Sequence, residues 1–212
     1  MASHLTIRTK VNIITILLVF TIGTLPVPVS ASGGSATSFE LPTLASVIDS
    51  AKNGPPVLHK LYIDDLITLP IVQQPRGNST FVSPLQDYLT EYQTASNFGT
   101  VGLLAHNYLA GQYFFQILPG QEIRLVYSDH RIVRFVVTEI QQYQAVVPDS
   151  SSSDFIDLTT REYLNASQLF KKVYGNQSGN LILQTCIEAE QNPTWGRVFI
   201  IAEPVDQGST KR

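Results

Sequence analysis

The sequence predicts a mainly β protein, folded as a closed or nearly closed β-barrel of about seven to eight strands with one or two short helices. Short apolar runs of strand length follow one another from residue 61 onward, and turn-forming residues separate them. Helix signals are few, and strands do not alternate with helices as they would in a parallel α/β sheet. No internal repeat is visible in the sequence.

Composition favours one domain. Of the 212 residues, 43% are hydrophobic and 15% are charged, which is enough apolar material for a sizeable core. The net charge of −3 gives no basic field, so a nucleic-acid partner is not expected. We predict a signal peptide or membrane anchor over residues 1–31, a flexible linker over 32–60, a catalytic domain over 61–206 and a disordered tail over 207–212.

The N-terminus carries an export pattern. Arg8 and Lys10 precede an apolar run over residues 11–27, and Val29-Ser30-Ala31 has small residues at the spacing that signal peptidase reads. The run is near the short limit for a spanning helix, so a cleaved signal and a retained anchor both remain open. In either case the domain is expected outside the cytoplasm, secreted or on the outer face of the membrane.

The first half of the domain contains three predicted segments. Residues 66–72 indicate an edge-type strand, because Pro70 cannot donate to a central ladder. Residues 83–92 fit either a helix or a loop. Residues 100–105 form an apolar run that suits a buried strand.

The second half contains a hairpin and a helix. Residues 122–127 and 131–140 are predicted strands joined by a turn at 128–130. Thr159 and Glu162 fit a capping box, which predicts a helix from there to about residue 174.

The last two predicted strands carry the most informative residues. An apolar strand over residues 180–185 ends at Cys186, the single cysteine of the chain, which therefore has no partner for an internal disulfide. A polar loop over 188–193 follows, and Arg197 opens a strand over 198–202. If these strands are antiparallel neighbours, the guanidinium can lower the pKa of the thiol and bind a developing oxyanion. By itself, a lone cysteine equally fits a buried apolar side chain.

These residues resemble the sortases, cysteine transpeptidases of bacterial surfaces. Leu183-Gln184-Thr185-Cys186 is similar to the family's Leu-x-Thr-Cys strand motif, and Arg197 follows at about the family's spacing. Upstream, Leu103-Leu104-Ala105-His106-Asn107 is similar to the family's apolar segment that ends in a histidine. Ala105 stands where the family often has glycine. The resemblance covers about Leu61 to Val205 and implies a sortase-like barrel.

The resemblance also implies roles for individual residues. Cys186 would attack a peptide carbonyl and form a thioester, and His106 would protonate the departing amine and then activate an incoming one. Arg197 would orient the substrate and stabilise the oxyanion, with support from Thr185. The implied partners are peptide sorting signals of surface proteins and an amine acceptor of the cell wall or a pilin.

Neither a cofactor nor a metal is expected, because the sequence has no His or Cys cluster at metal-ligand spacing and no phosphate loop. Glu188 and Glu190 are interpreted as a solvated loop rather than a calcium site. Two other functions stay open. The same three residues could serve a secreted thiol peptidase that transfers the acyl group to water, and the barrel could be a non-catalytic surface module.

Overall fold

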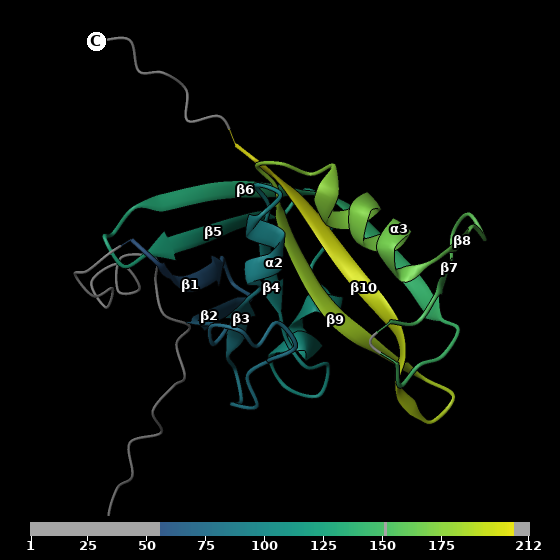
Figure 1. Ribbon diagram of the computed structural model, residues 1–212. Coiled ribbons are helices and arrows are strands. Elements are labelled where there is room, and N and C mark those ends of the chain that lie inside the picture. Colours follow the sequence, from purple (N-terminus) through teal and green to yellow (C-terminus); the bar gives the residue numbers. More distant parts are fainter. Residues whose placement is uncertain (1–55, 151, 206–212) are drawn as a thin grey trace, which may run out of the picture. The chain divides into compact units, whose positions relative to one another are not determined.

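The computed structural model describes residues 56–150 and 152–205 (Figure 1). The expected signal or anchor over residues 1–31, most of the expected linker and the expected tail over 207–212 lie outside the described residues. Within the described ranges, no helix is both long and apolar enough to cross a membrane.

One sheet of ten strands and four short helical segments make up the described part of the chain. The strands are β1 (Leu58–Ile63), β2 (Ile67–Gln73), β3 (Leu89–Glu91), β4 (Val101–Leu104), β5 (Glu122–Tyr127), β6 (Ile132–Ala145), β7 (Phe155–Asp157), β8 (Tyr163–Leu164), β9 (Leu181–Ala189) and β10 (Asn192–Pro204). The helical segments are α2 (Gln93–Ser96), the 3₁₀ helix η1 (Ala110–Gln116), α3 (Ala166–Phe170) and the π-helical turn η2 (Lys171–Gly175).

Eight of these strands close into a barrel. The neighbours run in the order β10-β9-β4-β3-β2-β1-β5-β6, and β6 then pairs with β10 to close the ring. The length of β6 makes this possible: its first residues pair with β5 and its last with β7, while β10 pairs along residues 135–144. The predicted mainly β, closed barrel of about seven to eight strands is therefore confirmed.

Alternate residues of the strands supply two apolar clusters. The first draws side chains from all eight barrel strands, among them Leu181 and Leu183 of β9, and fills the barrel interior. The second includes Ile182 of β9 and Phe199 of β10, packed against α3 and η2 on the outside of the sheet. Figure 1 shows α3 lying along β10. Because side chains alternate along a strand, residue parity decides which side of the barrel wall each one faces.

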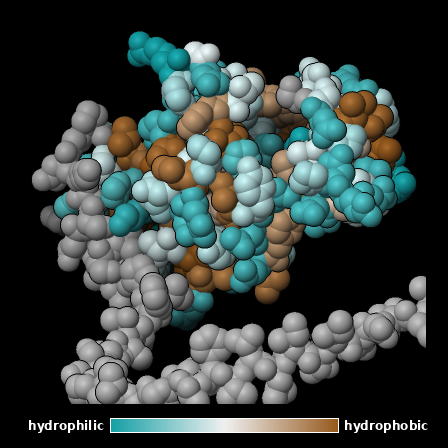
Figure 2. Space-filling view, turned by 90° about the horizontal axis from the view of Figure 1, so that it is seen from below, coloured by the Kyte–Doolittle hydropathy of each residue, from teal (hydrophilic) through white to brown (hydrophobic). Residues whose placement is uncertain are grey.

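Most of the large exposed apolar side chains in the described ranges lie in loops, not in strands or helices. These exposed side chains are Val57, Leu85, Phe98, Tyr108, Phe115, Leu118, Val146, Val147 and Tyr163. Figure 2, seen from below, shows apolar groups separated by polar ones on that face. This face therefore does not present one continuous apolar surface.

The predicted strands over residues 100–105, 122–127, 131–140, 180–185 and 198–202 are confirmed as β4, β5, β6, β9 and β10. β9 and β10 continue through most of the predicted polar loop. They meet at a turn in which Glu190 and Gln191 both have positive φ, 53° and 62°. The barrel also begins earlier than residue 61, since β1 starts at Leu58, whose side chain is buried.

The prediction of an edge strand over residues 66–72 was wrong. β2 pairs with β1 on one side and with β3 on the other. Proline is tolerated because β3 pairs only with residues 71–73 of β2, so beside Pro70 the strand has a neighbour in β1 alone.

Residues 83–92 were predicted as a helix or a loop, and the loop is the better description. The segment nevertheless ends in β3, a strand of three residues. Thr90 of β3 is fully buried, and its hydroxyl accepts a hydrogen bond from the backbone N–H of Ser83 at 2.8 Å. This contact folds the loop back onto the strand.

The predicted helix start at Thr159 was also wrong. α3 begins at Ala166, where Asn165 and Gln168 form a reciprocal capping box. The backbone N–H groups of Thr159 and Thr160 instead donate to the side chain of Asp157, which holds them in a turn. The predicted end of the helix is correct to within one residue, because η2 ends at Gly175.

Candidate active site

The β9–β10 hairpin places Cys186 opposite Arg197. The two residues are direct partners in the antiparallel register. Directly opposite residues project from the same face of a sheet, with their Cβ atoms about 4.5–5.5 Å apart. Cys186 lies an even number of residues after Ile182 on β9, and Arg197 lies two residues before Phe199 on β10. Ile182 and Phe199 face the outside of the barrel wall, so the side chains of Cys186 and Arg197 face the outside as well.

β4 brings His106 to the same end of the hairpin. β4 is the parallel neighbour of β9, with Leu104 opposite Gln184, and the N–H of Ala105 still donates to the carbonyl of Gln184 at 3.2 Å. His106 is two residues beyond Leu104, just as Cys186 is two residues beyond Gln184. The chain then turns, and the carbonyl of His106 accepts hydrogen bonds from the N–H groups of Leu109 and Gly111.

The environment of Cys186 favours the neutral thiol. Burial raises the pKa of the thiol, and the positive charge of Arg197 offsets only part of that rise. The sequence analysis expected the guanidinium to lower the pKa. Arg197 does lower the pKa, as expected, but burial of the thiol raises it by more, so the net shift is upward. Near neutral pH the sulfur therefore carries its proton and needs a base or a bound substrate before it can react.

Arg197 donates hydrogen bonds to its own hairpin and still has unused N–H donors in the described part of the chain. Its Nη1 donates to the carbonyl of Thr194 at 3.0 Å and to that of Gly196 at 2.8 Å. A guanidinium has five N–H donors, and in the described part of the chain Nε and Nη2 of Arg197 donate to no other group. This leaves donors for an anionic oxygen beside Cys186.

Thr185 faces the other way. Its side chain is buried, and its hydroxyl donates to the carbonyl of Ala105 at 2.8 Å. A hydroxyl has one hydrogen to donate, and this one is already used between β9 and the end of β4. Thr185 therefore fastens the backbone immediately before His106 to the strand that carries Cys186.

Two residues that were given no site role from the sequence, Gly111 and Tyr108, also contact this region. A Cβ added to Gly111 would lie 2.2 Å from the hydroxyl oxygen of Thr185 and 2.7 Å from the carbonyl oxygen of His106, so only glycine fits there. The ring of Tyr108 stacks on the ring of His106, with centroids 5.2 Å apart. Neither contact leaves a periodic signal in the sequence.

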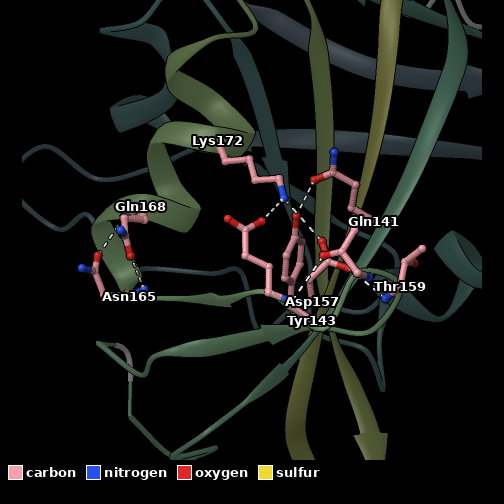
Figure 3. Close-up of polar contacts among 9 residues, drawn as sticks. Gln141, Tyr143, Asp157, Thr159, Asn165, Gln168 and Lys172 are labelled. Atoms are coloured by element: carbon pink, nitrogen blue, oxygen red, sulfur yellow. Dashed lines mark hydrogen bonds and ion pairs between the residues drawn. The ribbon is translucent and has the colours of Figure 1, made fainter.

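A second polar cluster lies beneath α3 and η2 (Figure 3). Lys172 forms ion pairs with Asp157 at 3.4 Å and with Glu162 at 3.1 Å. Burial by itself would raise the pKa of Asp157, but backbone donors from Thr160 and Thr159, together with Lys172, outweigh it and leave the pKa below its ordinary value. All the charged groups here have partners, so the cluster serves to fasten the helix to β7.

Two described cavities lie away from the expected catalytic residues. One of about 290 Å³ is lined by residues of the loop after β2 and of α2, and one of about 250 Å³ lies next to Asp157 and Lys172. Neither is lined by Cys186, His106 or Arg197. Over residues 56–150 and 152–205, no group of three or more His, Cys, Asp or Glu side chains could hold a metal ion.

Among known proteins, the chain is similar only to solved structures. No protein-family model and no curated protein matches the chain. Sortase A from Listeria monocytogenes is 12% identical with a TM-score of 0.43, over 70% of this chain and 87% of that one. Sortase A from Corynebacterium diphtheriae is 16% identical with a TM-score of 0.48, over 73% and 63%.

A sortase C from Clostridium perfringens, solved with a C-terminal cell wall sorting motif, is 19% identical with a TM-score of 0.44, over 71% of each chain.

Proposed function

We propose that this protein is an exported, sortase-like cysteine transpeptidase that cleaves a peptide sorting signal and transfers the acyl fragment to an amine. One observation carries the proposal. The strand register sets Cys186 directly against Arg197, and the parallel pairing of β4 with β9, which runs to Leu104 and Gln184, leads the chain into His106 at the same end of the hairpin. A thiol, an imidazole and a guanidinium at one end of three neighbouring strands are the groups that thioester chemistry needs.

In the first half of the proposed reaction, His106 accepts the thiol proton and the sulfur of Cys186 attacks the scissile carbonyl carbon. Because the thiol is the resting form, proton transfer accompanies attack. Collapse of the tetrahedral intermediate breaks the C–N bond, and His106 returns the proton to the departing amine. The product is an acyl thioester on Cys186.

In the second half, an amine attacks the thioester carbonyl while His106 accepts a proton from it. The C–S bond breaks, a new amide forms, and the proton goes to the departing sulfur. In both halves the carbonyl oxygen carries negative charge. The Nε and Nη2 groups of Arg197 supply the charged donors for it, since Nη1 is occupied by the hairpin.

For Thr185 we propose a positioning role in place of direct oxyanion support. Its only hydroxyl hydrogen is directed at the carbonyl of Ala105, away from the face that carries Cys186. The proposal of export rests on the N-terminal sequence alone, in which an apolar run follows two basic residues.

An acceptor-dependence assay tests the proposal. The full chain is incubated with a library of short sorting-signal peptides, with and without an amine acceptor, and products are followed by mass spectrometry. Transpeptidation predicts a ligated product that forms only with the acceptor and is absent from Cys186→Ala. Cleavage at the same rate without an acceptor would instead identify a thiol peptidase. If the wild type acts on none of the peptides and its thiol resists alkylation, the proposed chemistry is wrong.

A further inference from the structure

The side chain that follows His106 reaches the hairpin that carries Arg197. Nδ2 of Asn107 donates to the carbonyl oxygen of Pro193 at 3.0 Å, joining residues 86 positions apart. Pro193 is near the start of β10, four residues before Arg197. Among side-chain hydrogen bonds in the described part of the chain, this one alone joins the turn after β4 to β10.

The next residue of the hairpin holds the guanidinium. The carbonyl of Thr194 accepts from Nη1 of Arg197 at 3.0 Å. The N–H of Thr194 donates to the side chain of Asn192 at 2.8 Å, and its hydroxyl contacts Asp149 at 2.9 Å. Two consecutive carbonyls of the hairpin are therefore hydrogen-bond acceptors. That of Pro193 accepts from Asn107, on the His106 side of the site, and that of Thr194 accepts from Arg197.

This stretch of the hairpin is irregular. The register between β9 and β10 shifts between Asn192 and Gly196, so the regular ladder is interrupted where Pro193 and Thr194 lie. A bulge of this kind bends a strand and re-aims its side chains. The side chains of Asn107 and Asp149, from neighbouring segments, form hydrogen bonds with these two residues.

The opposite side of the site is held through its backbone. The backbone of the His106 turn is fastened from within the barrel by the N–H of Gly111 and, through Ala105, by Thr185. The imidazole itself stacks on Tyr108, which is 67% exposed. On the side that faces Arg197, the contact that fixes this turn is the amide of Asn107.

We propose that Asn107 is a positioning residue, whose amide ties the His106 turn to the bulged segment that holds Arg197 and so sets the spacing between imidazole and guanidinium. Its consequence for catalysis rests on the proposed function. Because Gly111 and Thr185 hold the turn independently, loss of the tie leaves the fold intact and loosens only the approach of His106.

The test compares three variants of the full chain. Asn107→Leu keeps the size of the side chain, removes the donor and adds no charge, whereas Asn107→Gln keeps an amide. Asn176→Leu is the matched control, at an exposed asparagine whose side chain donates to no group in the described residues. The measurements are kcat and KM for peptide cleavage, and the imidazole NMR signals of His106, assigned by their absence in His106→Gln.

Asn107→Leu is expected to lower kcat by about tenfold with KM within about twofold, because small misplacements of a catalytic group are costly in rate. It should also shift and broaden the His106 signals. Asn107→Gln should recover part of both effects, and Asn176→Leu should show neither.

The NMR measurement needs no substrate, so it separates the two proposals. If the wild type cleaves no peptide, the proposed function fails, while altered His106 signals in Asn107→Leu still support the tie. If the His106 signals of Asn107→Leu match those of the wild type, the proposed positioning role of Asn107 is wrong, whatever happens to kcat or to thermal stability. Altered signals in an active enzyme with unchanged kcat overturn it as well.

Discussion

At the scale of single residues, the reactivity of Cys186 is set by two opposed effects. Burial raises the pKa of the thiol, and the charge of Arg197 directly across the hairpin lowers it. The balance leaves a protected thiol that becomes nucleophilic when a base and a substrate are in place. Such a thiol is less exposed to adventitious oxidation than a resting thiolate.

The first prediction concerns this balance. Arg197→Gln removes the positive charge that lowers the pKa of Cys186, so that pKa should rise further. Alkylation of the thiol near neutral pH should slow by a factor of a few, since each unit of pKa changes the thiolate fraction about tenfold. The rate is measured with iodoacetamide across a pH series. Arg76→Gln, at an exposed arginine remote in sequence, controls for net charge. An unchanged alkylation profile in Arg197→Gln contradicts the pairing.

The second prediction concerns Gly111. In Gly111→Ala the new Cβ meets the hydroxyl of Thr185 at 2.2 Å and the carbonyl of His106 at 2.7 Å, and neither the buried hydroxyl nor the backbone can yield cheaply. Overpacking of this kind costs about 1–3 kcal/mol of unfolding free energy. Urea unfolding measures it. A midpoint equal to that of the wild type means that the turn after His106 is looser than described.

At the scale of elements, the helical segment over α3 and η2 is fastened to the sheet by few charged contacts. Lys172 joins Asp157 and Glu162, and Asp157 also caps the turn before β8 (Figure 3). Because this segment covers the outer apolar cluster next to β9 and β10, its attachment supports the strands that carry Cys186 and Arg197.

The third prediction is a pH dependence. The pKa of Asp157 is lowered on folding, so its contribution to stability is complete above the ordinary aspartate pKa of 3.8 and is lost as pH falls below that value. Asp157→Asn should cost about 1–3 kcal/mol at pH 7 and clearly less at pH 3. Urea unfolding of both proteins at the two pH values gives the comparison. A cost that does not shrink at acid pH argues against a charged role for Asp157.

Local patterns predicted most strands but misplaced the helix. Apolar runs identified β4, β5, β6, β9 and β10 because each is buried on at least one face. The capping pattern at Thr159 predicted a helix start six residues before Asn165, where α3 is capped. Asp157 prevents the earlier start, because its side chain takes the N–H groups of Thr159 and Thr160 for a turn. This local side-chain contact competes with the helix in a way that the capping pattern alone does not reveal.

At the scale of the whole molecule, non-local pairing makes the site. The parallel contact between β4 and β9 brings together residues about 80 positions apart, and closure through β6 and β10 removes the edge beside Arg197. Short motifs and a family resemblance led to the prediction of Cys186, His106 and Arg197 as catalytic residues, and the structure shows that the strands next to them are neighbours. The contacts of Thr185, Gly111 and Asn107 were not predictable from the sequence, because each crosses between segments that the sequence does not align.

The fourth prediction separates fold from chemistry. The side chain of Cys186 is partly exposed on the outside of the barrel wall, so Cys186→Ala should change the unfolding free energy by less than about 1 kcal/mol. Circular dichroism and urea unfolding check this. A large loss of stability would mean that the sulfur is a core side chain, which would weaken its assignment as a nucleophile.

The most direct test of the central claim is the intact mass of the protein after exposure to sorting-signal peptides and an acid quench. If Cys186 is the nucleophile, the wild type gains the mass of the N-terminal peptide fragment as a thioester, mapped to Cys186 and lost on treatment with hydroxylamine. Cys186→Ala gains nothing. An adduct on another residue, or peptide turnover that persists in Cys186→Ala, would contradict the account.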